Sequence, residues 1–188
     1  MTTIVVVIKN GRATLGADSL ATYGSIKEPS SLFRSEEKLI KCGATFIAIA
    51  GTATFKQALI EILRGQAMPD LDSVAAVFRF VNTSLGSLKE DYHLQTITDQ
   101  GSPELVDMDL LLLGTGGAFC VFSNRTVHEV AKYYAFGSGA DIALGALHAL
   151  YDGALDSEGL CRAALDAAST FDTQTGGPYT IETLSVRR

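Results

Sequence analysis

The sequence contains no tryptophan, four prolines and only three cysteines, Cys42, Cys120 and Cys161. The cysteines are widely spaced and form no C-x-x-C pair, which excludes a zinc ribbon and a thioredoxin-type redox site. Each lies in an apolar stretch, where a free thiol packs as a small hydrophobic side chain. We therefore expect three structural thiols in a reducing compartment, which favours a cytoplasmic protein.

Positive charge and long apolar runs are also scarce. Fifteen Lys and Arg residues stand against twenty-one Asp and Glu residues, for a net charge of −6, so the basic surface that attracts nucleic acid is absent in bulk. No segment reaches the ~18 consecutive apolar residues of a membrane helix, and the first residues lack the basic start of a signal peptide. We expect neither nucleic acid nor a membrane among the partners.

The sequence does contain enough apolar material for a core, with 47% hydrophobic and 19% charged residues among 188. A chain of this length can bury a core without disulfide or metal support, and domains usually run about 100–200 residues. No internal repeat or linker interrupts the pattern. We predict a single domain over residues 1–188.

The first half of the chain predicts strands followed by helices. The β-branched run 4–8 is typical of a strand buried on both faces, and Asn10-Gly11 after it is the strongest short signal for a hairpin. The other expected strands and loops are a returning strand at 12–18, a polar loop at 25–35 that contains Pro29, and a strand pair at 38–42 and 45–50. Helical spacing predicts two helices, one from Thr52 to near Gly65 and one capped by Asp72 or Asp70 that extends to Leu85.

The second half repeats this order. The expected elements are a hairpin of strands 107–113 and 119–122, a strand at 126–135, helices over 140–153 and 157–168, and a final strand at 179–186, with 92–103 left unassigned. Strands, two helices, strands, two helices and a strand argue for packed layers of sheet and helix and against alternating βαβ units. We predict an α+β fold in which two central sheets are flanked by helix pairs.

Three motif fragments fall short of the sites that they suggest. His128-Glu129 begins a zinc-peptidase pattern, but Lys132 stands where the second histidine is required. The glycine-rich segment 114–117 lacks the Lys-Ser/Thr ending of a phosphate-binding loop, so a hairpin turn is expected there. Ser138 lies between two glycines without the G-x-S-x-G spacing of a serine hydrolase.

Thr2 stands at the head of the first buried strand. A small residue after an initiating methionine generally allows that methionine to be removed, and we expect the mature chain to lose Met1 and begin at Thr2. An N-terminal threonine carries its own general base, because an α-amine titrates near pH 8. The neutral amine can take the hydroxyl proton while Oγ attacks a carbonyl carbon. Thr2 is therefore a candidate nucleophile.

Other polar residues fall at the ends of the predicted elements. Asp18 ends the second strand and Lys38 begins the third. An aspartate beside a lysine keeps the ammonium group charged, and the ammonium group favours an alkoxide nearby. Gly51 precedes a predicted helix, whose free N–H groups can bind an oxyanion. A polar cluster at 172–177 follows the last helix.

As a set, in this order and spacing, these residues resemble the proteasome β-subunit and HslV family of N-terminal-nucleophile hydrolases. The resemblance spans residues 2–184 and is carried by five segments: Thr2-Thr3-Ile4-Val5, Asn10-Gly11, Gly16-Ala17-Asp18-Ser19-Leu20-Ala21-Thr22, Phe136-Gly137-Ser138-Gly139 and Tyr179-Thr180-Ile181-Glu182-Thr183-Leu184. It is closest to the bacterial, HslV-like side, and within the family to the proteasome homologue described from β-proteobacteria. It implies a four-layer αββα sandwich, in agreement with the predicted element order.

The resemblance also implies roles for the matching residues. Thr2 matches the nucleophile whose amine is the base, Asp18 matches the acid that pairs with the catalytic lysine, and Gly51 matches the glycine of the oxyanion hole. Lys38 matches the lysine, but the loop before it is longer than in HslV, so Lys41 and Lys27 remain alternatives.

Further roles follow from the same resemblance. Ser138 matches the serine that hydrogen-bonds the amine, and Asp172 and Thr175 match the pair that supports this serine and the amine. Ala48 and Ile49 are expected at the base of the substrate pocket. The resemblance implies no required cofactor, although the loop of Ser169, Asp172 and Thr175 can bind a monovalent cation such as Na+ through backbone carbonyls.

The implied function is that of a threonine endopeptidase subunit that cleaves polypeptides inside stacked homo-oligomeric rings. The resemblance allows rings of six or of seven subunits. The Asp172-x-x-Thr175-Gly176-Gly177 pattern favours seven, and hence a 14-mer. An ATPase or another ring activator is an implied partner. The main alternative is a proteasome-fold ring that serves as a scaffold or binding chamber with weak or lost catalysis, which a retained Met1 would favour. A third interpretation, hydrolysis of a small amide, is disfavoured by the lack of a second domain.

Overall fold

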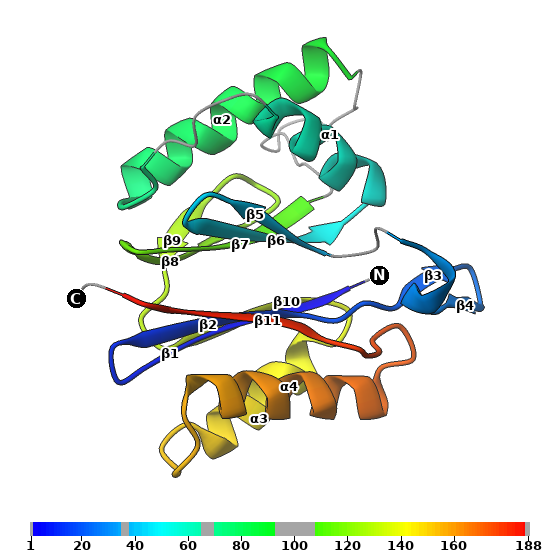
Figure 1. Cartoon of the computed structure of the whole chain (residues 1–188), viewed down its shortest axis with the longest axis vertical. Helices are drawn as coiled ribbons and strands as arrows, with labels where there is room; N and C mark the ends of the chain where they lie inside the picture. Colours follow the sequence, from blue (N-terminus) through cyan, green and yellow to red (C-terminus); the bar gives the residue numbers. More distant parts are fainter. Residues whose placement is uncertain (1, 35–37, 65–69, 93–107, 187–188) are drawn as a thin grey trace.

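The computed structural model describes residues 2–34, 38–64, 70–92 and 108–186. Within these residues two β-sheets lie face to face, and a pair of helices covers the outer face of each (Figure 1). The buried apolar side chains form three clusters, one between the sheets and one beneath each helix pair. The predicted αββα sandwich is therefore confirmed.

The first sheet has the order β10-β1-β2-β11, and all neighbouring strands are antiparallel. Its strands are β1 (Thr3–Lys9), β2 (Arg12–Ala17), β10 (Tyr133–Gly137) and β11 (Thr180–Ser185). β1 lies inside the sheet and is buried on both faces, as its β-branched run predicts. Asn10 and Gly11 join β1 to β2 with φ angles of 53° and 74°, the left-handed backbone that a tight two-residue hairpin requires.

The second sheet has the order β5-β6-β7-β8-β9. Its strands are β5 (Leu39–Cys42), β6 (Thr45–Gly51), β7 (Met108–Gly114), β8 (Gly117–Val121) and β9 (Val127–Glu129). Because side chains alternate along a strand, Ala48 and Ala50 of β6 join the cluster between the sheets, whereas Ile47 and Ile49 join the cluster beneath the helices. β6 thus contributes side chains to the apolar clusters on both of its faces.

The helices complete the outer layers. α1 (Ala53–Leu63) and α2 (Val74–Glu90) cover the second sheet, and α3 (Ala140–Leu150) and α4 (Ser157–Phe171) cover the first (Figure 1). The fully buried face of α4 consists of Leu160, Cys161, Ala164, Leu165 and Ala168. This spacing gives the apolar stripe by which an amphipathic helix packs on a sheet.

The cysteines have the environments expected of structural thiols. All three are free; Cys120 and Cys161 are buried and Cys42 is half-buried. Burial raises the pKa of the Cys161 thiol to about 12, so this thiol stays protonated near neutral pH. Among the described helices, none has the length and apolar character needed to cross a membrane.

The prediction of a polar loop at 25–35 is wrong for the described residues up to 34. This segment contributes β4 (Ile26–Glu28), which pairs with β3 (Ala21–Tyr23), and a short 3-10 turn, η1 (Ser30–Leu32). The small hairpin turns at Gly24, whose φ angle is 58°. It projects from one end of the sandwich (Figure 1) and its strands bury little surface, so no alternation of apolar residues marks it in the sequence.

Two further local predictions are corrected. The N-cap of α2 is neither Asp72 nor Asp70 but Ser73, whose Oγ accepts a hydrogen bond from the Ala76 N–H at 3.3 Å. The predicted strand 126–135 is two strands, β9 and β10, which belong to different sheets.

The break between β9 and β10 has a clear cause. The Val130 N–H donates to Ala118 O of the second sheet at 2.8 Å, whereas Lys132 O accepts from the Ile8 N–H of the first at 2.6 Å. The chain thus crosses from one sheet to the other within three residues. The unassigned stretch 92–103 lies, from residue 93 onward, outside the described residues.

Candidate active site

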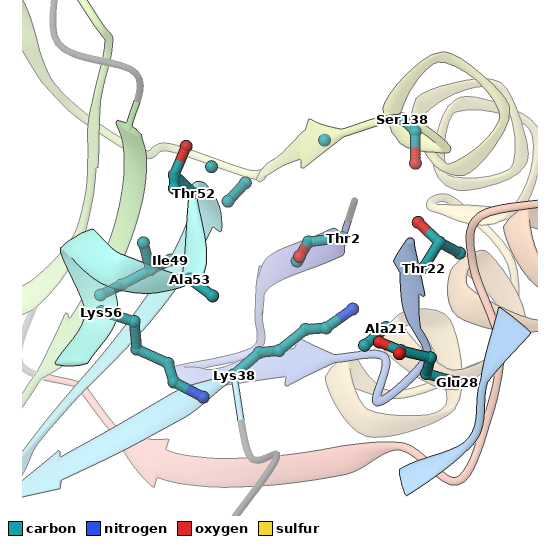
Figure 2. A pocket seen from close by; sticks show the side chains of 13 residues that line it. Thr2, Ala21, Thr22, Glu28, Lys38, Ile49, Thr52, Ala53, Lys56 and Ser138 are labelled. Carbon is teal, nitrogen blue, oxygen red and sulfur yellow. The ribbon is translucent and has the colours of Figure 1, made fainter. Parts of the chain in front are cut away.

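The start of β1 places two adjacent threonines on opposite faces of the first sheet. Thr3 shares its face with Val5 and Val7, which pack against α3 and α4, since side chains along a strand alternate. Thr2 therefore faces the other way, and it lines a cavity of about 510 Å³ at the end of the sandwich (Figure 2). Thr2 is 6% exposed and Thr3 is fully buried.

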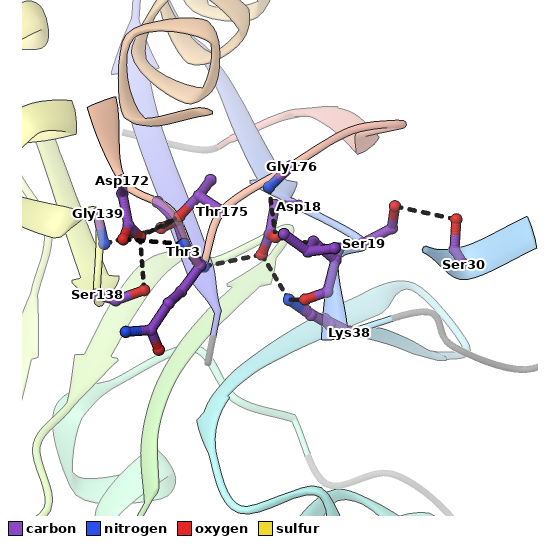
Figure 3. Close-up of polar contacts among 12 residues, drawn as sticks. Thr3, Asp18, Ser19, Ser30, Lys38, Ser138, Gly139, Asp172, Thr175 and Gly176 are labelled. Atoms are coloured by element: carbon purple, nitrogen blue, oxygen red, sulfur yellow. Dashed lines mark hydrogen bonds and ion pairs between the residues drawn. The ribbon is translucent and has the colours of Figure 1, made fainter. Parts of the chain in front are cut away.

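Asp18 follows β2 and lies beside the start of β1. Its Oδ1 accepts hydrogen bonds from the Thr3 N–H at 2.8 Å and from Lys38 Nζ at 2.7 Å. Its Oδ2 accepts from the N–H groups of Leu20 and Gly176, both at 3.1 Å. A buried carboxylate costs free energy unless such donors surround it, and these four tie together four separate parts of the chain (Figure 3).

Lys38 precedes β5 and extends into the cavity toward Thr2 (Figure 2). Its Nζ donates to Asp18 Oδ1 and, at 2.6 Å, to Leu20 O, and its side chain is 9% exposed. The structure thus brings Lys38, as predicted, together with Asp18 and Thr2. The alternative Lys41 is elsewhere, with its Nζ over the ring of Phe46, and Lys27 lies in β4.

Ser138 approaches Thr2 from the opposite side of the cavity. Its N–H donates to Thr2 O at 2.9 Å, and its Oγ donates to Asp172 Oδ2 at 2.6 Å. Thr175 Oγ1 donates to the same oxygen at 2.6 Å. The predicted group of Ser138, Asp172 and Thr175 is therefore assembled in space.

The Asp172 carboxyl group is held in its charged form. Partial burial by itself would raise its pKa, but hydrogen bonds from the Ser138 hydroxyl, the Thr175 hydroxyl and the Gln174 N–H outweigh burial, so that the pKa lies below its ordinary value. A carboxylate that accepts several hydrogen bonds is stabilised as the anion. Near neutral pH, Asp172 is thus an acceptor only.

Gly51 is the last residue of β6 and lines the cavity with Thr52 and Ala53. Its φ angle is 143°, a backbone conformation that favours glycine. α1 begins at Ala53, and the first N–H groups of a helix lack partners within it. The predicted oxyanion-binding position is therefore at the edge of the same cavity as Thr2.

Ala48 and Ile49, the two residues predicted at the base of the pocket, differ in position. Ile49 lines the cavity, but Ala48 is fully buried between the sheets and is not among the lining residues, so the placement of Ala48 is corrected. Ala50 and Gly51, which follow Ile49 in β6, also line the cavity, so Ala48 lies too far from the end of the strand to reach it. Three polar residues of the wall were not foreseen: Thr22, Glu28 and Lys56.

The loop that the resemblance associates with a monovalent cation follows α4. Asp172 uses its carboxylate for Ser138, Thr175 and Gln174, and Thr175 uses its hydroxyl for Asp172 and Thr3. These side-chain oxygens are already engaged. The binding of a cation through the backbone carbonyl groups of this loop stays a prediction.

The glycines around Ser138 and the side chain of Thr3 have structural roles that the sequence alone did not predict. Gly137 has a φ angle of 101°, and a Cβ atom there would lie 1.7 Å from Thr2 O, so only glycine fits. The Gly139 N–H donates to Thr3 Oγ1 at 3.0 Å. The alternation of side chains along β1 was the one signal that could have shown that Thr3 faces away from the cavity.

Comparisons with known proteins support one family. No family model matches the chain. The chain is 38% identical to Thiobacillus denitrificans BPH, solved in complex with epoxomicin, with a TM-score of 0.92 over 99% of this chain and 100% of that one. It is 26% identical over 183 residues, 97% of this chain and 89% of the relative, to the ATP-dependent protease subunit HslV of Bartonella quintana (strain Toulouse).

A more distant structure shows the same fold. Eukaryotic HslV from Trypanosoma brucei is 22% identical, with a TM-score of 0.68 over 97% of this chain and 99% of that one. Together with the αββα layers, these matches define the class as that of the N-terminal-nucleophile hydrolases. Within this class, the chain belongs to the proteasome β-subunit and HslV family.

Proposed function

We propose that the protein is a threonine endopeptidase subunit in which Thr2, exposed as the N-terminus by removal of Met1, is the nucleophile. The observation that carries the proposal is the convergence of Thr2, Lys38 and Ser138 on one cavity, with Asp18 bonded to Lys38 behind it. Met1 itself lies outside the described residues. An N-terminal threonine supplies the hydroxyl group and the base from one residue. The remaining groups only have to orient the amine and the substrate and to stabilise charge.

The proposed reaction has two steps. Thr2 Oγ attacks the carbonyl carbon of the substrate while its proton passes to the α-amine, and the nearby Lys38 ammonium group stabilises the developing negative charge on Oγ. The Gly51 N–H stabilises the oxyanion of the tetrahedral intermediate. The α-ammonium group then protonates the leaving amine, which gives an ester on Thr2. In the second step the amine activates a water molecule, which hydrolyses the ester and frees Thr2.

The hydrogen bonds around Ser138 support a role for this residue in orienting the amine. Its hydroxyl proton is directed to Asp172, so its lone pairs remain available as acceptors. Figure 2 places its side chain across the cavity from Thr2. An amine that donates a hydrogen bond to Ser138 Oγ is held with its own lone pair directed elsewhere, and we propose that it faces Thr2 Oγ.

We further propose that the subunits assemble into stacked rings that enclose the cavities, with polypeptides as substrates and an ATPase or another ring activator as partner, in the cytoplasm. The name of the Bartonella relative, an ATP-dependent protease subunit, supports an ATPase as partner. Large exposed apolar side chains in the β3–β4 hairpin and in η1 support assembly: Tyr23 is 76% exposed, Leu32 68% and Ile26 61%. Groups of such side chains mark interaction surfaces in soluble proteins.

The test is intact-mass spectrometry of the purified protein before and after incubation with epoxomicin. We expect loss of Met1 and a single adduct located on Thr2, and no adduct on the Thr2→Ala variant. A chain that retains Met1 and forms no adduct, and still forms none after enzymatic removal of Met1, would contradict the proposal and favour a ring without proteolytic activity.

A further inference from the structure

We propose that Thr3 is a positioning residue for the reaction. Its hydroxyl group joins the start of α3 to the loop after α4 and thereby holds Ser138 against Thr2. The inference rests on the proposed function, which makes Thr2 the nucleophile. It concerns a side chain that lies on the far face of the first sheet from the cavity. Thr3 touches neither the reacting atoms nor the substrate in this scheme and acts through its neighbours.

Thr3 is at the centre of the hydrogen-bonded group in Figure 3. Its side chain is fully buried, and its Oγ1 accepts from the Gly139 N–H at 3.0 Å and lies 2.5 Å from Thr175 Oγ1. Its N–H and carbonyl group both bond to Asp18, at 2.8 and 3.1 Å. One residue therefore contacts both halves of the site, the Asp18 side through its backbone and the Asp172 side through its hydroxyl.

The direction of each hydrogen bond follows from proton counting. A carboxylate only accepts, and a hydroxyl has one proton to donate. The Thr175 proton goes to Asp172 Oδ2, so the bond between the two threonines must use the Thr3 proton. The order is then Gly139 N–H to Thr3, Thr3 O–H to Thr175 and Thr175 O–H to Asp172. Each hydroxyl along this chain donates its one proton and accepts one hydrogen bond.

This chain of bonds closes on Ser138. Asp172 Oδ2, where the chain ends, also accepts from Ser138 Oγ, and Gly139, where the chain begins, is the next residue after Ser138 and the N-cap of α3. Ser138 is thus held from its side chain and from its backbone by a network that passes through Thr3. Its own N–H then bonds to Thr2 O at 2.9 Å.

The space around the hydroxyl is filled. A Cβ atom on Gly139 would lie 2.6 Å from Thr3 Oγ1 and 3.0 Å from Thr175 Oγ1. Valine at position 3 would keep the shape of threonine but leave the Gly139 N–H and an acceptor site on Thr175 without partners. Buried polar groups without partners are costly, so we expect the start of α3 to shift. Ser138 would then lose its fixed position beside Thr2.

The location of Thr3 distinguishes positioning from binding. Thr3 is not among the residues that line the cavity, so its replacement should slow the chemical step without weakening occupancy of the cavity. Geometric errors of about 1 Å can cost about 100-fold in rate. The expected signature of Thr3→Val is therefore a fall in the maximal rate with unchanged half-saturation.

The experiment measures epoxomicin adduct formation by intact mass at a series of epoxomicin concentrations. It yields the maximal rate of modification and the concentration that gives half of this rate. We expect Thr3→Val to lower the maximal rate by about 10- to 100-fold with an unchanged half-saturating concentration. Thr3→Ser, which keeps the hydroxyl, should restore the rate to within about threefold of the wild type.

Thr14→Val is the matched control. Thr14 is also a fully buried threonine of the first sheet, and its Oγ1 bonds to Ser157 and Thr183, both at 2.9 Å. This network is separate from the one around Ser138. Thr14→Val removes a comparable pair of buried hydrogen bonds, so it should lower thermal stability to a similar degree while the modification rate stays at the wild-type value.

The outcomes separate the inference from the proposed function. A wild-type protein that forms no adduct refutes the proposed function, whereas a reactive wild type with an equally reactive Thr3→Val overturns the role of Thr3 alone. An inactive Thr3→Ser, or a Thr14→Val variant as slow as Thr3→Val, would also overturn it. If Thr3→Val does not fold, Thr3→Ala, which lacks the hydroxyl and introduces no added volume, provides the same comparison.

Discussion

At the scale of single residues, we expect the ion pair of Lys38 and Asp18 to support both the stability of the fold and the proposed activity. The Asp18 side chain has no exposed area, and Lys38 is the only cation bonded to it among the described residues. We predict that Lys38→Ala lowers the rate of epoxomicin modification by at least about 100-fold, because the charge that we propose to stabilise Thr2 Oγ is lost. It should also lower the free energy of unfolding by about 3 kcal/mol, since a buried carboxylate loses its counter-charge.

The control for this prediction is Lys41→Ala, which removes a lysine three residues further along. The Lys41 side chain lies over the Phe46 ring and not at the cavity, so its loss should leave the modification rate unchanged. Denaturant unfolding of both variants measures the change in stability, and the kinetics of adduct formation measure the change in modification rate. A Lys38→Ala variant that reacts at the wild-type rate would remove Lys38 from the mechanism.

The same scale shows what could be predicted residue by residue. Thr2, Asp18 and Lys38 could be placed because each stands at the end of a strand whose apolar pattern is plain in the sequence. The contacts of Thr3 could not, since its partners Gly139 and Thr175 are 136 and 172 residues away along the chain. No local pattern encodes such a pairing, which depends on where α3 begins and α4 ends against the sheet.

At the scale of elements, the connection between α3 and α4 depends on one lysine. Lys9 ends β1, and its Nζ donates to the carbonyl oxygens of Tyr151, Gly153 and Leu155 at 2.7–2.8 Å. Hydrogen bonds to a charged group stabilise more than neutral ones. We predict that Lys9→Met lowers the free energy of unfolding by about 2 kcal/mol, which corresponds to a fall in Tm of about 4–8 °C for a chain of this size.

Lys27→Met serves as the matched substitution for this second test. Lys27 lies in the exposed strand β4, and its side chain forms no hydrogen bond or ion pair in the described part of the chain, so the Tm of Lys27→Met should stay within about 1 °C of the wild type. Calorimetry of both variants gives the comparison. Equal Tm values for Lys9→Met and the wild type would show that the three carbonyl groups find other partners.

Elements also differ in how far the sequence predicts them. The strands and helices of the sandwich could be predicted because each buries an apolar face with its own period. The β3–β4 hairpin could not, because it projects from the sandwich and its residues are mostly exposed. The break between β9 and β10 was missed because apolar residues continue through it, and only the change of hydrogen-bond partner, from Ala118 to Ile8, marks it.

At the scale of the whole molecule, assembly and catalysis should be separable. Thr2 contributes its carbonyl oxygen to the bond with the Ser138 N–H, and alanine keeps this oxygen. Its side chain faces the cavity and not the outer surface (Figure 2). We therefore predict that Thr2→Ala abolishes modification by epoxomicin and leaves both Tm and the assembly state unchanged.

Light scattering on the wild type and on Thr2→Ala tests this separation. Stacked rings of six or seven subunits would give the same mass for both proteins, roughly twelve or fourteen times the chain mass of 19.9 kDa, because symmetric closed rings admit only whole numbers of subunits. A wild type that remains at the mass of one chain would rule out an enclosed chamber. The side chains of Tyr23, Ile26 and Leu32 would then remain exposed to solvent, and control of substrate access by a chamber would have to be abandoned.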